Sequence, residues 1–146
     1  MTTPIYTDLQ RIVPDPGIDP EVLAGVYLRH EFDTRATGYV VCNEIDPGET
    51  FAVPVVRVVT SNTDTVMRGV LDVALIEFDV FGRDREATQA AARLTRALMQ
   101  AAKGVRVGSA VITTVPAEAD GLGPRLEPDP ELYRFGFTNE LSIHPA

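Results

Sequence analysis

Alternating apolar and polar positions dominate the middle of the chain and predict a strand over Val70–Gly82. Two residues per period place one wholly apolar set on a single face: Ala74, Ile76, Phe78 and Val80. The opposite face mixes apolar residues with two acids: Val73, Leu75, Glu77, Asp79 and Phe81. Because a buried surface does not tolerate unpaired carboxylates, we expect the first face to pack on the core. The second should meet water, a partner or a basic residue.

A helical period follows directly and predicts a helix over residues 84–102. Gly82 should end the strand, Asp84 should be the N-cap, and Glu86 adds negative charge to the first turn. Gly104 is typical of a helix C-terminus, where glycine adopts the left-handed conformation. The positions expected to face the sheet are Ala87, Ala90, Ala91, Leu94, Ala97, Leu98 and Ala101.

Proline punctuates the N-terminal half. Thr3-Pro4 and Asp19-Pro20 each predict a helix start, and Val22, Leu23, Val26 and Tyr27 extend the second helix to about Arg29. Pro54 cannot donate to a ladder, so we expect an edge strand, a bulge or a strand start near Val55. The remaining elements expected there are a loop over 33–37, a strand over Gly38–Ile45, a turn at Asp46-Pro47-Gly48, β structure over Phe51–Thr60 and a polar hairpin loop over Ser61–Gly69.

After the long helix, Val105–Pro116 predicts one strand, with a possible bend at Gly108-Ser109. Ala117–Pro130 is rich in glycine, proline and acid and predicts a loop that serves as a contact element. Tyr133–His144 predicts the last strand, with Tyr133, Phe135 and Phe137 on one face. Acids precede these aromatics, which favours core packing over a base-stacking platform.

The order of elements is therefore helix, strand, strand, strand, helix, strand, strand. Strands joined by turns favour antiparallel pairing. Helices on one face of such a sheet make an α+β two-layer domain, with a mainly antiparallel sheet. The chain has 146 residues, 45% of them hydrophobic, so we expect a single globular domain over 1–146.

Acidic residues outnumber basic ones, 21 to 13, for a net charge of −8. This balance argues against a surface that grips nucleic acid, which needs clustered Lys and Arg. It is compatible with a passage through which DNA slides, or with acidity that keeps the protein in solution. Cys42 is the only cysteine, so no intrachain disulfide can form and a reducing compartment is expected. The sequence also predicts no membrane span and no signal peptide.

The sequence offers little catalytic chemistry. His30 and His144 are far apart and, with one cysteine, do not predict a zinc site. The sequence contains neither a G-x-S-x-G nucleophile motif nor a P-loop. Glu77 and Asp79 share a strand face and leave two alternatives: an acid–base or cation-binding pair, or an interfacial face with Arg57 as counter-charge.

Four segments together resemble one protein family. These are Val22–Arg29, PVVRVVTSN (54–62), LDVALIEFDVFGRDREATQAAARLTRALMQA (71–101) and RFGFTNELSIHP (134–145). In order and texture they resemble the tail terminator proteins of long-tailed (siphovirus-like) bacteriophages, especially those infecting actinobacteria. The resemblance covers most of the chain and carries no catalytic motif. Other neck, tail-completion or head-closure proteins share this size and texture.

The resemblance implies a virion structural protein that forms a ring, usually of six copies. Such a ring caps the tail tube, ends tube growth and joins the tail to the head connector. Its partners are further copies of itself, the tube protein and connector proteins, and genomic DNA passes through without sequence-specific binding. No cofactor, metal or catalysis is implied, and assembly takes place in the host cytoplasm. The candidate interface or channel-facing residues are Glu77, Asp79, Arg57, Arg134 and Asp120.

Overall fold

The computed structural model describes residues 19–67, 71–113 and 117–145. Two helices occur in this part of the chain, α2 (Pro20–Thr34) and α3 (Arg85–Gln100). The strands are β1 (Val40–Cys42), β2 (Val55–Met67), β3 (Leu71–Gly82), β4 (Arg106–Val107), β5 (Ala110–Ile112), β6 (Ala117–Pro124) and β7 (Tyr133–Pro145). The helix expected at Thr3 lies outside the described residues.

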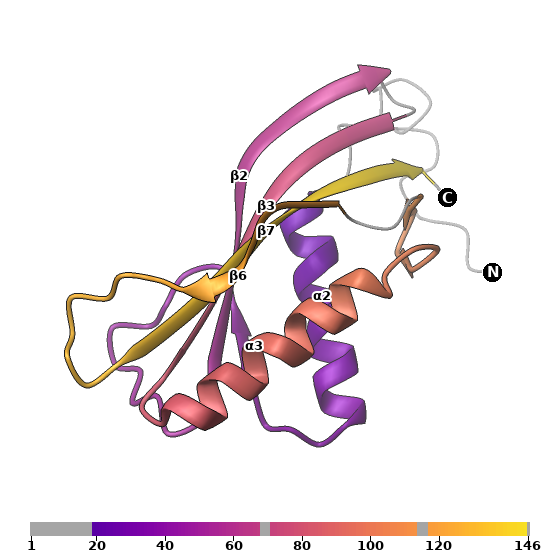
Figure 1. Cartoon of the computed structure of the whole chain (residues 1–146). Coiled ribbons are helices and arrows are strands. Elements are labelled where there is room, and N and C mark those ends of the chain that lie inside the picture. The colour runs from indigo at the N-terminus through magenta and orange to yellow at the C-terminus, as the bar shows by residue number, and fades with distance from the viewer. Residues whose placement is uncertain (1–18, 68–70, 114–116, 146) are drawn as a thin grey trace.

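The strands form one curved sheet in the order β1-β2-β3-β7-β5-β4, with β6 also paired to β7 (Figure 1). Only the β1–β2 pair is parallel; the other described pairs are antiparallel. Both helices cover the same face of the sheet (Figure 1). The predicted α+β fold, with a mainly antiparallel sheet and helices on one face, is therefore confirmed.

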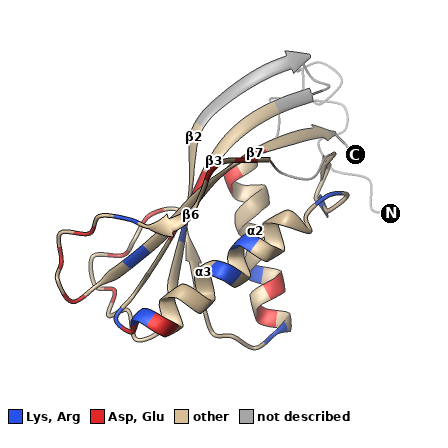
Figure 2. Cartoon of the chain, viewed as in Figure 1, with Lys and Arg blue, Asp and Glu red and all other residues tan. Residues whose placement is uncertain are grey.

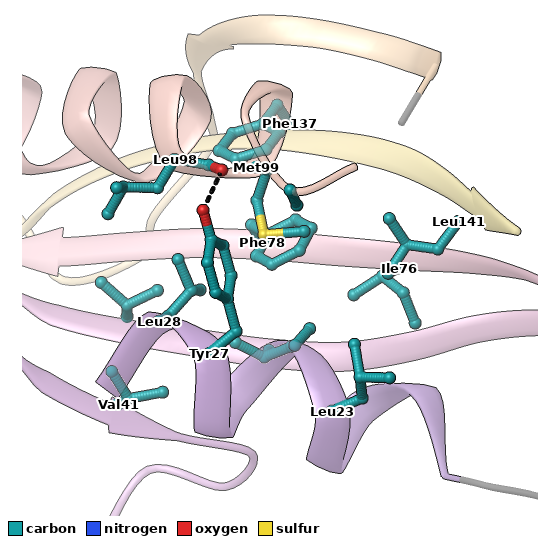
Figure 3. Close-up of a cluster of buried hydrophobic side chains, with 14 of the residues drawn as sticks. Leu23, Tyr27, Leu28, Val41, Ile76, Phe78, Leu98, Met99, Phe137 and Leu141 are labelled. Atoms are coloured by element: carbon teal, nitrogen blue, oxygen red, sulfur yellow. Dashed lines mark hydrogen bonds between the residues drawn. The ribbon is translucent and has the colours of Figure 1, made fainter. Parts of the chain in front are cut away.

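The core lies between this face and the two helices. The predicted apolar face of β3 is fully buried: Ala74, Ile76, Phe78 and Val80 are each 0% exposed. Phe78 stacks on Phe137 of β7 with ring centroids 4.9 Å apart. The two helices are joined where the Tyr27 hydroxyl donates to the Leu98 carbonyl oxygen at 2.6 Å (Figure 3). Of the three aromatics predicted for the core, Phe135 and Phe137 are buried and Tyr133 is exposed.

Helix α3 begins after Asp84 as predicted, but its buried face is rotated from the expected one. The side chains that face the sheet are Thr88, Ala91, Ala92, Thr95, Leu98 and Met99, whereas Ala87, Ala90, Ala97 and Ala101 are exposed and Leu94 is half-buried. The threonine hydroxyls donate to the carbonyls of Asp84 and Ala91, at 2.6 and 2.8 Å. These bonds satisfy the hydroxyls inside the helix, so threonine is tolerated in the core.

Helix α2 also differs from its prediction. It continues to Thr34 instead of ending at Arg29, so the loop expected over 33–37 starts later. Phe32 lies one turn beyond Leu28, and both are buried against the core, which extends the helix. Leu23 and Tyr27 are buried, whereas Val22 and Val26 are 55% and 44% exposed.

The first two strands differ in length from the predicted ones. β1 is only three residues long, shorter than the predicted Gly38–Ile45, and it pairs with Val55–Arg57 of β2. β2 begins at Val55, directly after Pro54, as predicted. It then continues through the segment expected to be a hairpin loop, to Met67. Among described residues, no strand covers the outer edge of β2 beyond Arg57, so polar residues are accommodated there.

The C-terminal half contains two more strands than predicted. The described part of the strand predicted over 105–116 forms two strands instead of one. β4 and β5 fold back on each other around Gly108, where a bend was expected and φ is +59°. Residues 117–124, expected to be a loop, form edge strand β6 on β7. β6 is almost entirely exposed, so its glycine- and acid-rich composition does not resemble that of a core strand. The loop that remains covers 125–132.

Candidate functional site

The sheet face opposite the helices carries a cluster of charged residues, here called the charged face: Arg57, Glu77, Asp79, Asp120, Arg125 and Arg134. The register explains how they meet. Arg57 on β2, Asp79 on β3 and Gly136 on β7 are aligned across neighbouring strands. Phe81 and Arg134 are aligned one step along the same strands. Residues from four strands and the adjoining loop therefore converge in the charged face, with Asp79 at its centre.

Asp79 is the centre of the charged face, with only 1% of its side chain exposed. Arg57 Nη2 donates to Asp79 Oδ2 and Arg134 Nε donates to Asp79 Oδ1, each at 3.0 Å. Burial raises the pKa of Asp79, but the hydrogen bonds from Arg134 and Arg57 outweigh burial and lower the net pKa. Asp79 is therefore a buried, ionised anchor that holds two guanidinium groups.

Glu77 forms the second, more open part of the charged face. Its Oε1 lies 3.6 Å from Arg134 Nη2 and 3.8 Å from Arg125 Nη1. Arg125 Nη2 lies closer to Asp120 Oδ2, at 2.9 Å. Burial, together with the hydrogen bond and charge of Asp79, raises the pKa of Glu77 despite both arginines. The arginines therefore contact Asp79 more closely, at 3.0 Å, than they contact Glu77, at 3.6 and 3.8 Å.

Two residues without charge give this cluster its shape. Phe81 lies under both guanidinium groups, with the Arg57 and Arg134 Cζ atoms 5.3 and 5.4 Å from its ring centroid. Gly136 leaves the space next to Asp79 open: a Cβ there would lie 2.5 Å from Asp79 Oδ1 and 2.9 Å from Arg125 Nε. Glycine at this position is what allows the carboxylate and Arg125 to approach the strand.

The charged face also holds the base of the loop over 125–132. Arg134 Nη1 donates to the Leu126 carbonyl oxygen at 3.3 Å, and the Arg125 backbone N–H donates to the Arg134 carbonyl oxygen at 2.8 Å. Beyond this base the loop carries three acids, Glu127, Asp129 and Glu131 (Figure 2). Leu126 is 90% exposed. The cluster therefore presents an exposed leucine within an acidic loop.

The ion pairs fix the positions of the charged side chains on this face of the sheet. Three arginines balance three carboxylates, and the most buried carboxylate, Asp79, is bonded to two of the arginines. Among the described residues, no group of three or more His, Cys, Asp or Glu could hold a metal ion. No helix of the described chain is long and apolar enough to cross a membrane.

All five residues predicted for an interface or channel lie together on the charged face. The counter-charge expected for the acidic strand face is provided by Arg57 and Arg134. Sequence reasoning missed Arg125 and the roles of Phe81 and Gly136. A signal for the last is present in the pattern Arg134-Phe135-Gly136, where a glycine occupies the polar face of an otherwise alternating strand.

No family model matches this chain, and no curated protein matches it. Among solved structures, a chain of the virion of a native gene transfer agent (GTA) particle has a similar fold. The two superpose with a TM-score of 0.61 over 90% of this chain and 100% of the other, at 13% sequence identity. At this identity the likeness concerns the fold.

Proposed function

We propose that this chain is a structural protein of a phage-like virion, and that it acts as a tail terminator. The observation that carries the proposal is the fold, which is similar over 90% of the chain to a component of a gene transfer agent virion. The family resemblance of four segments, noted from the sequence, supports the same class of protein independently of the superposition.

The chemistry of the charged face supports a structural role for Glu77 and Asp79. An enzyme that used them as an acid–base pair would need both carboxylates within hydrogen-bond reach of the substrate. Asp79 is 1% exposed and bonded to two arginines, and Glu77 lies within 4 Å of two arginines. In this proposal the charges fix the shape of an assembly surface.

In the proposed role, each copy of the chain is a single domain, and six copies are expected to form a ring. The ring caps the tail tube, ends its growth and contacts the head connector. Its partners are other copies of the chain, the tube protein and the neck proteins, and DNA passes through the centre. The net charge of −8 supports such passage, because an acidic surface gains nothing from phosphate counterion release.

Deleting the gene from a producing strain and examining the particles by electron microscopy tests whether the protein ends the tail tube. Loss of a terminator should give tube-like tails of uncontrolled length that are not joined to heads. Loss of a head-closure protein should instead give tails of normal length beside heads that have lost DNA. Complementation with the intact gene is the control. Normal, joined particles in the deletion strain would refute any essential neck or tail role.

A further inference from the structure

A groove lies on the helix side of the sheet, where α2 crosses β1 and β2. Its volume is about 380 Å³, and it is lined by Glu21, Val22, Gly25, Val26, Arg29, Val41, Cys42, Asn43 and Val58. Val22 and Val26 are the largest exposed apolar side chains of α2, at 55% and 44%. The groove is therefore an apolar depression with a polar rim.

One apolar side chain, that of Leu126, protrudes from the surface. Leu126 projects at the start of the 125–132 loop and is 90% exposed, the highest value among the large exposed hydrophobic residues of the described chain. Its backbone is fixed, because Arg134 binds the Leu126 carbonyl and the neighbouring Arg125 pairs with Asp120. An exposed leucine on a fixed backbone loses little conformational entropy when a partner buries it.

We propose that Leu126 of one copy inserts into the α2–β1 groove of the next copy. This inference rests on the proposed ring and names its contact. Charge supports this occupant. Arg29 on the groove rim donates to the Val41 carbonyl at 3.1 Å and has no carboxylate within ion-pair distance among the described residues. The Leu126 loop carries Glu127, Asp129 and Glu131, which complement Arg29. The other charged residue of the lining, Glu21, has its carboxylate engaged by hydrogen bonds from Asn43 and the Thr60 backbone N–H.

The placement of the two surfaces fits a closed ring. In the sheet order, β1 is at one end, and β2 and β3 separate it from β7, where the loop ends. The leucine and the groove are thus different patches on different parts of the molecule. A contact between unlike patches is heterologous, and repeating it produces a ring when the rotation closes. A self-complementary patch would instead stop at a dimer.

The native cysteine provides a direct test, because Cys42 lines the groove and is half-buried. In the full chain, Leu126→Cys should form a disulfide with Cys42 of the next copy under mild oxidation. Burial raises the pKa of the Cys42 thiol, so oxidation is best carried out above neutral pH. Non-reducing gels should show a ladder that extends beyond the dimer. Leu126→Cys combined with Cys42→Ser should remove the ladder, and Lys103→Cys controls for random collisions.

A second variant measures the contact without oxidation. Leu126→Asp should weaken self-association by roughly 10- to 100-fold, since it removes a buried leucine and adds charge to an apolar groove. At protein concentrations where both are monomeric, its urea midpoint should match the wild type, because the residue is exposed in one copy; at higher concentrations assembly itself stabilises the wild type. Asp129→Asn is the mild charge control.

The outcomes separate the contact from the ring. If the wild type assembles but Leu126→Asp assembles equally well, and Leu126→Cys cross-links no more than Lys103→Cys, the proposed contact is wrong and the ring stands. A ladder that stops at the dimer refutes the head-to-tail arrangement. A wild type that remains monomeric at every concentration refutes the ring itself, together with its contact.

Discussion

Replacing Asp79 by asparagine removes one negative charge from the centre of the charged face and leaves the side-chain shape almost unchanged. The carboxylate accepts hydrogen bonds from Arg57 and Arg134, each at 3.0 Å. Asparagine keeps one acceptor oxygen and presents an amide N–H to the other guanidinium group. One charge-assisted hydrogen bond is lost and two donors are left facing each other.

The size of the effect follows from exposure. A hydrogen bond to a charged group contributes roughly 1.5–3 kcal/mol, whereas an exposed ion pair contributes about 0–1 kcal/mol. Asp79 is 1% exposed, but its arginine partners are 30% and 23% exposed and partly screened by water. We therefore expect Asp79→Asn to lower the free energy of unfolding by about 2 kcal/mol. For a chain of this size, that corresponds to a melting temperature lower by roughly 4–8 °C.

Urea unfolding followed by circular dichroism measures this loss, with Asp120→Asn as the matched control. Asp120 is 62% exposed and pairs with Arg125 at 2.9 Å, so its substitution should cost less than about 1 kcal/mol. Because the folded-state pKa of Asp79 is lowered, its stabilisation is complete above the unfolded pKa of about 4 and is lost as pH falls through the folded pKa. An Asp79→Asn loss below about 0.5 kcal/mol at pH 7 refutes the anchor role.

Three further predictions concern the same fold. The raised pKa of Glu77 means that ionising its carboxyl group lowers the stability of the fold. Glu77→Gln should therefore be at least as stable as the wild type at pH 7, and the difference should vanish below about pH 4; a variant that unfolds at lower urea concentration than the wild type at pH 7 contradicts this. Gly136→Ala should lose about 1–3 kcal/mol by overpacking, whereas Gly121→Ala, in open space, should be nearly neutral; equal melting temperatures would disprove the clash. Leu98→Ala should cost about 2–4 kcal/mol and half-buried Leu94→Ala clearly less; equally large losses at both positions would place α3 in the predicted rotation.

The acids Glu77 and Asp79 made β3 predictable, because they alternate with the apolar residues Ile76, Phe78 and Val80. The rotation of α3 was not predictable from the same reasoning. Its alanines bring little apolar area to either side, and two of its core positions are threonines that satisfy their hydroxyls within the helix. Local hydrogen bonds of this kind make a polar residue type compatible with burial, and hydrophobic periodicity does not detect them.

The charged face was predictable in part for a related reason. Period two assigns Glu77 and Asp79 to one face and makes Arg57 and Arg134 plausible partners. Arg125 depends on the pairing of β6 with β7, and the glycine, proline and acid of β6 are typical of a loop. Edge strands need no apolar face when they are exposed on most of their surface, so composition conceals them. The burial of Asp79 follows only from the complete register.

The central claim is that copies of this chain close into a ring, and negative-stain electron microscopy of the purified full chain tests it most directly. The account predicts annular particles of uniform diameter with a central hole, and their loss in Leu126→Asp. Single compact particles at every protein and salt concentration would contradict it.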